Sequence, residues 1–142
     1  MPGIDLDIDA LVPHRRPMRL IDEVLEVSGD TAITMASVTA EWPTFADGAV
    51  QALVVIELVA QTAAVVGGYK AITDPNGDHV RKGMLVGIKR ADFQLSALPL
   101  DTRITTSATT RPLLENFKEI RGFSKIGDQI IGEIVLQGVQ VA

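Results

Sequence analysis

The longest apolar segment of the chain runs from residue 49 to residue 72 and contains few polar positions. Apolar residues occupy most faces of a helix drawn through it, which is typical of a helix wrapped by other elements. Asp47 precedes the segment and is a candidate N-cap residue. The pattern therefore predicts one long buried helix in the middle of the chain.

Segments rich in β-branched residues lie on both sides of this helix. Residues 5–11 predict a short helix stopped by Pro13, and residues 19–40 predict two strands joined by a turn at residues 28–30. The polar stretch at residues 73–79 predicts a loop after the long helix. Four further β-rich segments follow, at residues 82–95, 102–111, 117–126 and 129–140.

This order of elements predicts an α+β fold in which an antiparallel sheet wraps around one central helix. The short connections between the β-rich segments favour antiparallel pairing over parallel crossovers. The chain has no linker, internal repeat or low-complexity segment, so we expect residues 1–142 to form one domain. A single sheet around a single helix leaves surfaces uncovered, and a dimer is the simplest way to cover them.

Composition excludes several classes of protein. Apolar residues make up 46% of the chain, which argues against disorder, and the net charge of −5 argues against a nucleic-acid partner. The chain has no cysteine, no histidine pair at metal-ligand spacing and no glycine-rich phosphate motif, so no metal or cofactor is expected. The N-terminus lacks the features of a secretory signal, and we expect a cytoplasmic protein that does not enter a membrane.

Glu57 and Gln61 are two polar residues within the predicted apolar helix, and they lie one helical turn apart. Burying an unpaired carboxylate costs several kcal/mol or more. Such a group is therefore usually paired, exposed or used in chemistry. Glu57 is accordingly either a carboxylate that reaches solvent or an arginine, or a candidate catalytic residue.

Three segments of the chain resemble the hot-dog-fold 3-hydroxyacyl-ACP dehydratases of fatty acid synthesis, and above all their relatives from aryl polyene gene clusters. The segments are LVPHRRPMRLIDEVLEV, ALVVIELVAQTAAVVGGY and GMLVGIKRADFQ. The resemblance implies a hot-dog fold and a dimer with its active site at the subunit interface. It further implies that an acyl chain on phosphopantetheine enters an apolar tunnel, so an acyl carrier protein or a CoA thioester is the expected partner.

The resemblance also implies which residue performs each step of the reaction. In the family, a histidine removes the Cα proton, a carboxylate on the central helix acts on the departing hydroxyl, and backbone N–H groups polarise the thioester carbonyl. Glu57 matches the carboxylate. The family's histidine lies fourteen residues before this carboxylate, and Pro43 occupies that position in this chain. His14 is thus the candidate base, or else a structural residue of its loop, and Gln61 either orients the carboxylate or bonds to the backbone.

Basic residues form two candidate binding groups. Arg15 and Arg16 are suited to a pantetheine phosphate or to an acidic carrier protein, and the alternative is an ion pair with Asp22 or Glu23. Lys89 and Arg90 are expected to follow a strand that ends near the tunnel mouth, and the same two interpretations apply to them.

The leading functional prediction is elimination of water from a 3-hydroxyacyl-ACP to give the trans-2-enoyl thioester. Two alternatives stay open, because the usual loop histidine is missing. One is an acyl-ACP or acyl-CoA thioesterase, which also uses a carboxylate on the central helix. The other is a catalytically weakened subunit that binds acyl-ACP within a dehydratase heterodimer. The assembly is expected to be a homodimer, a higher assembly of dimers or a mixed dimer with a related subunit.

Overall fold

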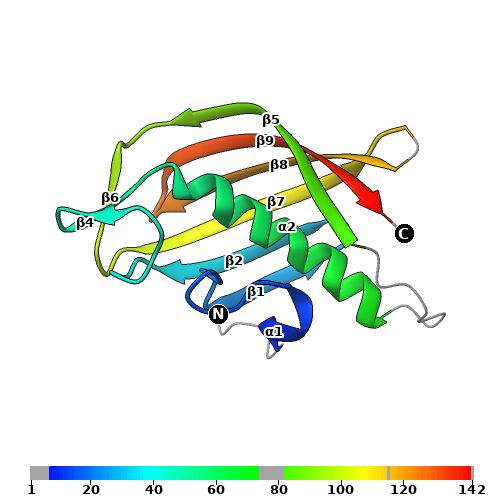
Figure 1. The fold of residues 1–142 in the computed structure, drawn as a ribbon, viewed down its shortest axis with the longest axis horizontal. Coiled ribbons are helices and arrows are strands. Elements are labelled where there is room, and N and C mark those ends of the chain that lie inside the picture. The colour runs from blue at the N-terminus through cyan, green and yellow to red at the C-terminus, as the bar shows by residue number, and fades with distance from the viewer. Residues whose placement is uncertain (1–6, 74–81, 115, 142) are drawn as a thin grey trace.

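The computed structural model describes residues 7–73, 82–114 and 116–141. Six antiparallel strands form one sheet in the order β1-β2-β7-β8-β9-β5. Their bounds are Glu23–Ser28 (β1), Thr31–Ser37 (β2), Arg103–Pro112 (β7), Phe117–Ile126 (β8), Gln129–Val141 (β9) and Lys82–Phe93 (β5). The helix α2, Val54–Thr73, lies along the inner face of this sheet (Figure 1). The predicted α+β fold is therefore confirmed.

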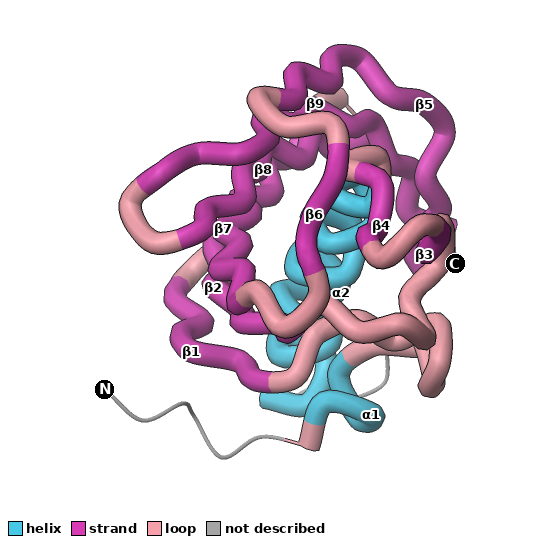
Figure 2. The backbone as a smooth tube through the Cα atoms, turned by 90° about the vertical axis from the view of Figure 1, so that its left-hand side faces the viewer, coloured by secondary structure: helices cyan, strands magenta, loops and turns pink. Residues whose placement is uncertain are grey.

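Smaller elements cover the two ends of α2. A three-stranded sheet of β3 (Phe45–Ala46), β4 (Ala49–Gln51) and β6 (Ala97–Pro99) lies near the start of the helix. The short helix α1, Ile8–Leu11, lies near its other end (Figure 2). The predicted loop after the long helix lies outside the described residues, apart from Thr73, which ends α2.

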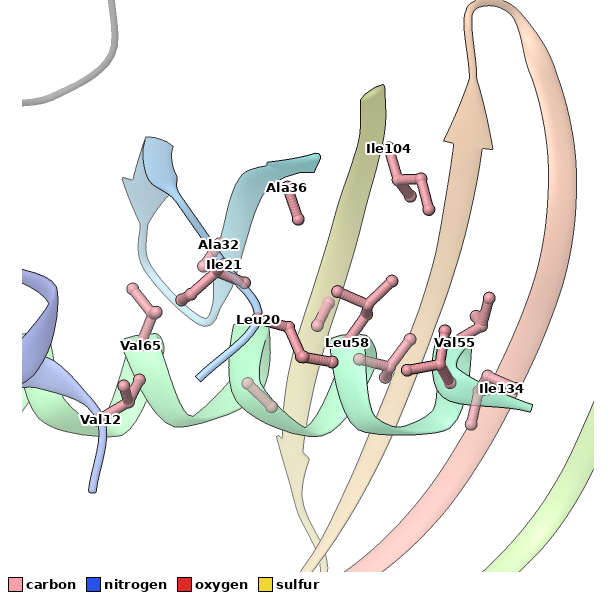
Figure 3. Packing of buried hydrophobic residues seen from close by; sticks show 14 of the residues in the cluster. Val12, Leu20, Ile21, Ala32, Ala36, Val55, Leu58, Val65, Ile104 and Ile134 are labelled. Carbon is pink, nitrogen blue, oxygen red and sulfur yellow. The ribbon is translucent and has the colours of Figure 1, made fainter. Parts of the chain in front are cut away.

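The core forms where alternating residues of the strands face the helix. In β7, Ile104 and Ala108 are buried while Thr109 on the opposite face is exposed, as the twofold periodicity of a strand requires. Figure 3 shows Val55 and Leu58 of α2 packed among buried apolar residues that include Ile104. Each fully buried aliphatic side chain contributes roughly 1.5–3 kcal/mol. This burial explains why the apolar residues of α2 extend around most of the helix.

By length and composition α2 could also cross a membrane, since its 20 residues have a mean hydropathy of 1.3. Seven of its apolar residues are instead buried within the fold, so we interpret it as the core helix. The cytoplasmic location expected from the sequence stays a prediction.

The predicted start of the long helix is wrong. The helix begins at Val54, and residues 49–51 form strand β4, which pairs with β3 and β6. Asp47 and Gly48 have φ angles of 52° and 81°, and they form the two-residue turn between β3 and β4. Positive φ at both central positions is what a type I′ hairpin turn requires, and Asp-Gly favours it. Asp47 is thus a turn residue and not a helix cap.

The close approach of α1 to α2 depends on Gly68. A Cβ atom built on Gly68 would lie 2.0 Å from the backbone oxygen of Leu11. We expect Gly68→Ala to lower the free energy of unfolding by about 1–3 kcal/mol, because α1 has to move away. Thermal unfolding followed by circular dichroism measures this loss.

Gly67→Ala is the matched control. No atom lies within 4 Å of a Cβ built on Gly67, and alanine is preferred to glycine inside a helix by about 1 kcal/mol. This variant should therefore be as stable as the wild type or more stable. Equal melting temperatures for the Gly68→Ala variant and the wild type would contradict the described contact between the two helices.

Candidate active site

His14 lies in the loop between α1 and β1, and the arginines that follow it hold this loop together. Nη1 of Arg15 donates to the carbonyl oxygens of Val12 at 2.8 Å and of His14 at 3.0 Å. Arg16 pairs with Asp22, the alternative that the sequence left open for it. Arg15 keeps an exposed side chain. A role of either arginine in binding a phosphate or a carrier protein stays a prediction.

The loop brings His14 to Glu57, which projects from the first turn of α2. Nε2 of His14 lies 3.1 Å from Oε1 of Glu57, and the two side chains are 31% and 36% exposed. Nδ1 of His14 is buried and has no hydrogen-bond partner in the described part of the chain. His14 and Glu57, the two candidate residues for proton transfer, are therefore in contact at a partly exposed site, although they are far apart in the sequence.

Gln61 links the His14 loop to Glu57 from a fully buried position. Its Nε2 donates to Oε1 of Glu57 at 2.9 Å and to the carbonyl oxygen of Met18 at 2.7 Å, while its Oε1 accepts from the N–H of Leu20 at 2.8 Å. Both roles that the sequence left open for Gln61, contact with the carboxylate and with the backbone, occur together. No sequence pattern pointed to Met18 and Leu20, because they contribute backbone atoms.

Apolar and donor groups surround Glu57 on the open face of α2. Leu53 lies one turn before Glu57 on the same helix face and is 53% exposed. Within the described residues, the N–H groups of Leu53 and Val54 donate to no carbonyl oxygen, whereas that of Val55 bonds to Ala52. The start of the helix therefore presents free N–H groups and the positive end of the helix dipole near Glu57.

The position of the missing loop histidine contains no group that transfers protons. Pro43 stands there, next to Trp42, whose side chain is buried. An open apolar hollow of about 470 Å³ lies on the hairpin between β7 and β8, where Leu113, Leu114 and Phe117 line it. The acyl tunnel that the resemblance implies at a subunit interface stays a prediction.

Lys89 and Arg90 lie within β5, so their predicted position after the end of a strand is wrong. Nζ of Lys89 lies 3.5 Å from Oε2 of Glu119, and Arg90 pairs with Asp92. Arg121 donates a hydrogen bond to Glu119 and, with Lys89 and a further arginine, holds the pKa of that carboxyl below its ordinary value. Both basic residues have partners within the chain, and their role in substrate binding stays a prediction.

The chain matches the ApeP-like family, described as ApeP dehydratase, over residues 6–123. It is 34% identical over 108 residues to the 3-hydroxyacyl-[acyl-carrier-protein] dehydratase FabZ of Streptococcus pneumoniae serotype 4, covering 70% of this chain and 71% of the relative. The dehydratase heterocomplex ApeI:P from Xenorhabdus doucetiae is similar in structure, with a TM-score of 0.84, 22% identity and coverage of 96% and 92% of the two chains.

Thioesterase HI1161 from Haemophilus influenzae has a TM-score of 0.62 and 15% identity, covering 84% of this chain and 77% of the other. At these identities the likeness to solved structures shows the fold alone, and it confirms the predicted hot-dog fold.

Proposed function

Because the chain belongs to the ApeP-like dehydratase family, we propose that it removes water from a 3-hydroxyacyl thioester and forms the trans-2-enoyl thioester. The single observation that carries the proposal is the Glu57 carboxylate on the central helix, 3.1 Å from His14. The FabZ relative is named for substrates on an acyl carrier protein, and we extend that carrier to this chain.

The elimination requires two proton transfers and a group that stabilises the negative charge developing on the thioester oxygen. A proton leaves Cα, the Cα–Cβ double bond forms, and the hydroxyl leaves Cβ as water after receiving a proton. The thioester oxygen gains negative charge as the Cα proton departs. The free N–H groups of Leu53 and Val54 are suited to stabilise this charge, and Glu57 is suited to exchange the protons.

Two other functions have a supporting observation each. A thioesterase is favoured by the absent loop histidine, since water attack on a thioester needs only one carboxylate as general base. A binding subunit is favoured by the similarity to the dehydratase heterocomplex ApeI:P. The family match over residues 6–123 favours the dehydratase over both alternatives.

Product analysis separates the three functions. The purified protein is incubated with 3-hydroxyacyl and with saturated acyl thioesters of an acyl carrier protein, and enoyl absorbance and free thiol are followed. The dehydratase proposal predicts enoyl product from the first substrate and no thiol from either. Thiol release without enoyl product would indicate a thioesterase. Binding of acyl-ACP without either product would indicate a subunit that depends on a partner for activity.

Strand β5 is the edge through which we expect the chain to assemble. In the described part of the chain β5 pairs with β9 on one side, and its other side has no neighbouring strand. Three apolar side chains of this strand, Leu85, Val86 and Ile88, are between 45% and 57% exposed. An exposed apolar edge strand is a template for pairing with another chain. A dimer with a second copy or a related subunit would cover it and complete the open Glu57 site.

Ile88→Lys tests this assembly. A lysine at the paired edge would place an ammonium group in the interface, so we expect the dimer dissociation constant to rise by at least about tenfold. Analytical ultracentrifugation measures the change. Leu114→Lys is the matched control, because Leu114 is 85% exposed on the β7–β8 hairpin, away from this edge. If both variants associate as strongly as the wild type, the β5 edge is not the interface.

A further inference from the structure

The two oxygens of Glu57 are in different surroundings. Nε2 of His14 and Nε2 of Gln61 both approach Oε1, at 3.1 Å and 2.9 Å. Oε2 makes no hydrogen bond with any described residue. Glu57 is thus anchored through one oxygen while the other is free to meet a substrate.

The orientation of the Gln61 amide is determined by its three partners. Its oxygen accepts the N–H of Leu20, and its nitrogen donates to the Met18 carbonyl and to Glu57. A flipped amide would set its oxygen against the Met18 carbonyl and the Glu57 carboxylate, and its NH₂ group against the N–H of Leu20, so none of the three hydrogen bonds could form. Gln61 therefore supplies a hydrogen to Oε1.

The surroundings of His14 determine which ring nitrogen carries the proton. A hydrogen on Nδ1 would be a buried donor without an acceptor in the described part of the chain, and that costs roughly 1–3 kcal/mol. Without a proton on Nε2, two electron-rich atoms, Nε2 and Oε1, would lie 3.1 Å apart. The neutral ring avoids both penalties when its proton is on Nε2. In that state Nε2 cannot accept a proton from the substrate.

We infer that His14 and Gln61 are positioning residues that hold Glu57 as a carboxylate through Oε1, and that Oε2 carries out both proton transfers of the elimination. Oε2 takes the proton from Cα, and the electron pair of the C–H bond forms the Cα–Cβ double bond as the C–O bond at Cβ breaks. Oε2 then gives the same proton to the departing hydroxyl, which leaves as water. The carboxylate is regenerated without an external acid or base. This inference rests on the proposed dehydratase function, and it replaces the expected role of His14 as the base.

Nitrogen NMR of the wild-type protein tests the assignment without any activity measurement. Histidine labelled with ¹⁵N gives separate chemical shifts for protonated and unprotonated ring nitrogens, and the His14 signals are identified by their loss in His14→Gln. The inference predicts the neutral ring with its proton on Nε2. A neutral ring with its proton on Nδ1 would overturn it. Because this readout needs no turnover, it holds whether or not the protein proves to be a dehydratase.

Substitution of His14 by glutamine gives a second test. A glutamine amide nitrogen lies about where Nε2 does and can donate to Oε1, but it cannot accept a proton. We expect His14→Gln to retain enoyl formation within about tenfold of the wild type, while His14→Ala loses about 10²-fold because Glu57 is displaced. If His14→Gln is as slow as His14→Ala at equal melting temperature, His14 itself takes the proton and the inference fails.

Gln61→Glu isolates the amide donor, because it keeps the size of the side chain and an acceptor for Leu20. We expect kcat to fall by about 10²-fold with KM little changed, since substrate contacts remain and the carboxylate loses its donor. Thr62→Val is the matched control. It removes buried hydrogen bonds to Thr34 at 2.8 Å and to the Leu58 carbonyl at 2.7 Å, so it should lower the melting temperature and leave kcat unchanged. An unchanged kcat in Gln61→Glu would contradict the positioning role.

Discussion

Glu57→Gln is expected to slow enoyl formation by at least about 10³-fold with little change in stability. General acid–base groups typically contribute 10²–10⁴-fold, and an amide can neither take the Cα proton nor return it to the hydroxyl. The glutamine has the same shape, and its oxygen can still accept from Gln61. The melting temperature should therefore stay within a few degrees of the wild-type value. Single-turnover measurements with a 3-hydroxyacyl thioester quantify the loss.

Glu119→Gln makes the same chemical change at a carboxylate outside the site. Glu119 lies on β8 and bonds to Arg121 and Lys89. We expect this variant to lose some stability and to keep the wild-type rate. A Glu57→Gln variant that retains a tenth or more of the wild-type rate would exclude Glu57 as the group that transfers the protons, and the site assignment would then be abandoned.

His14→Ala is expected to give the second largest effect, a loss of about 10²-fold in rate with a nearly unchanged melting temperature. The alanine removes the group that faces Oε1 at 3.1 Å, and small displacements of a catalytic group cost about this factor. His14 is partly exposed, so its removal leaves little buried space. A lowered melting temperature with the wild-type rate would instead identify His14 as a structural residue of its loop.

The sheet and the long helix could be predicted because their sequence patterns are local. The alternation in β7 and β8 and the apolar run of α2 each specify one element without reference to distant residues. The β3–β4 hairpin was missed although Asp47-Gly48 is a hairpin signal. Its strands have only two and three residues, too few for alternation to separate them from the start of the helix.

The site could be predicted only in part. Helical spacing placed Glu57 and Gln61 on one face, because that relation is local. The contact between His14 and Glu57 depends on the path of the loop before β1. Backbone groups of Met18 and Leu20 hold that path by bonding to Gln61. Because only backbone atoms take part, the side chains of these two residues do not indicate the contact.

The sequence also did not determine the ion-pair partners of the basic residues. It offered Asp22 as an alternative for Arg16 and named no partner for Lys89. Arg16 bonds to Asp22 within its own loop, but Lys89 reaches Glu119 across the sheet. Only the strand order of the sheet determines that second contact. Spacing along the chain could not distinguish a binding residue from one paired within the fold.

In the proposed mechanism Glu57 carries out the proton transfers and His14 acts only through Glu57. A double-mutant cycle separates these roles, with enoyl formation measured for His14→Ala, Glu57→Gln and the double variant. We expect the double variant to be as slow as Glu57→Gln alone, within about threefold, because His14 has nothing left to position. A further loss of about 10²-fold in the double variant would exclude this mechanism, since His14 would then contribute independently of the carboxylate.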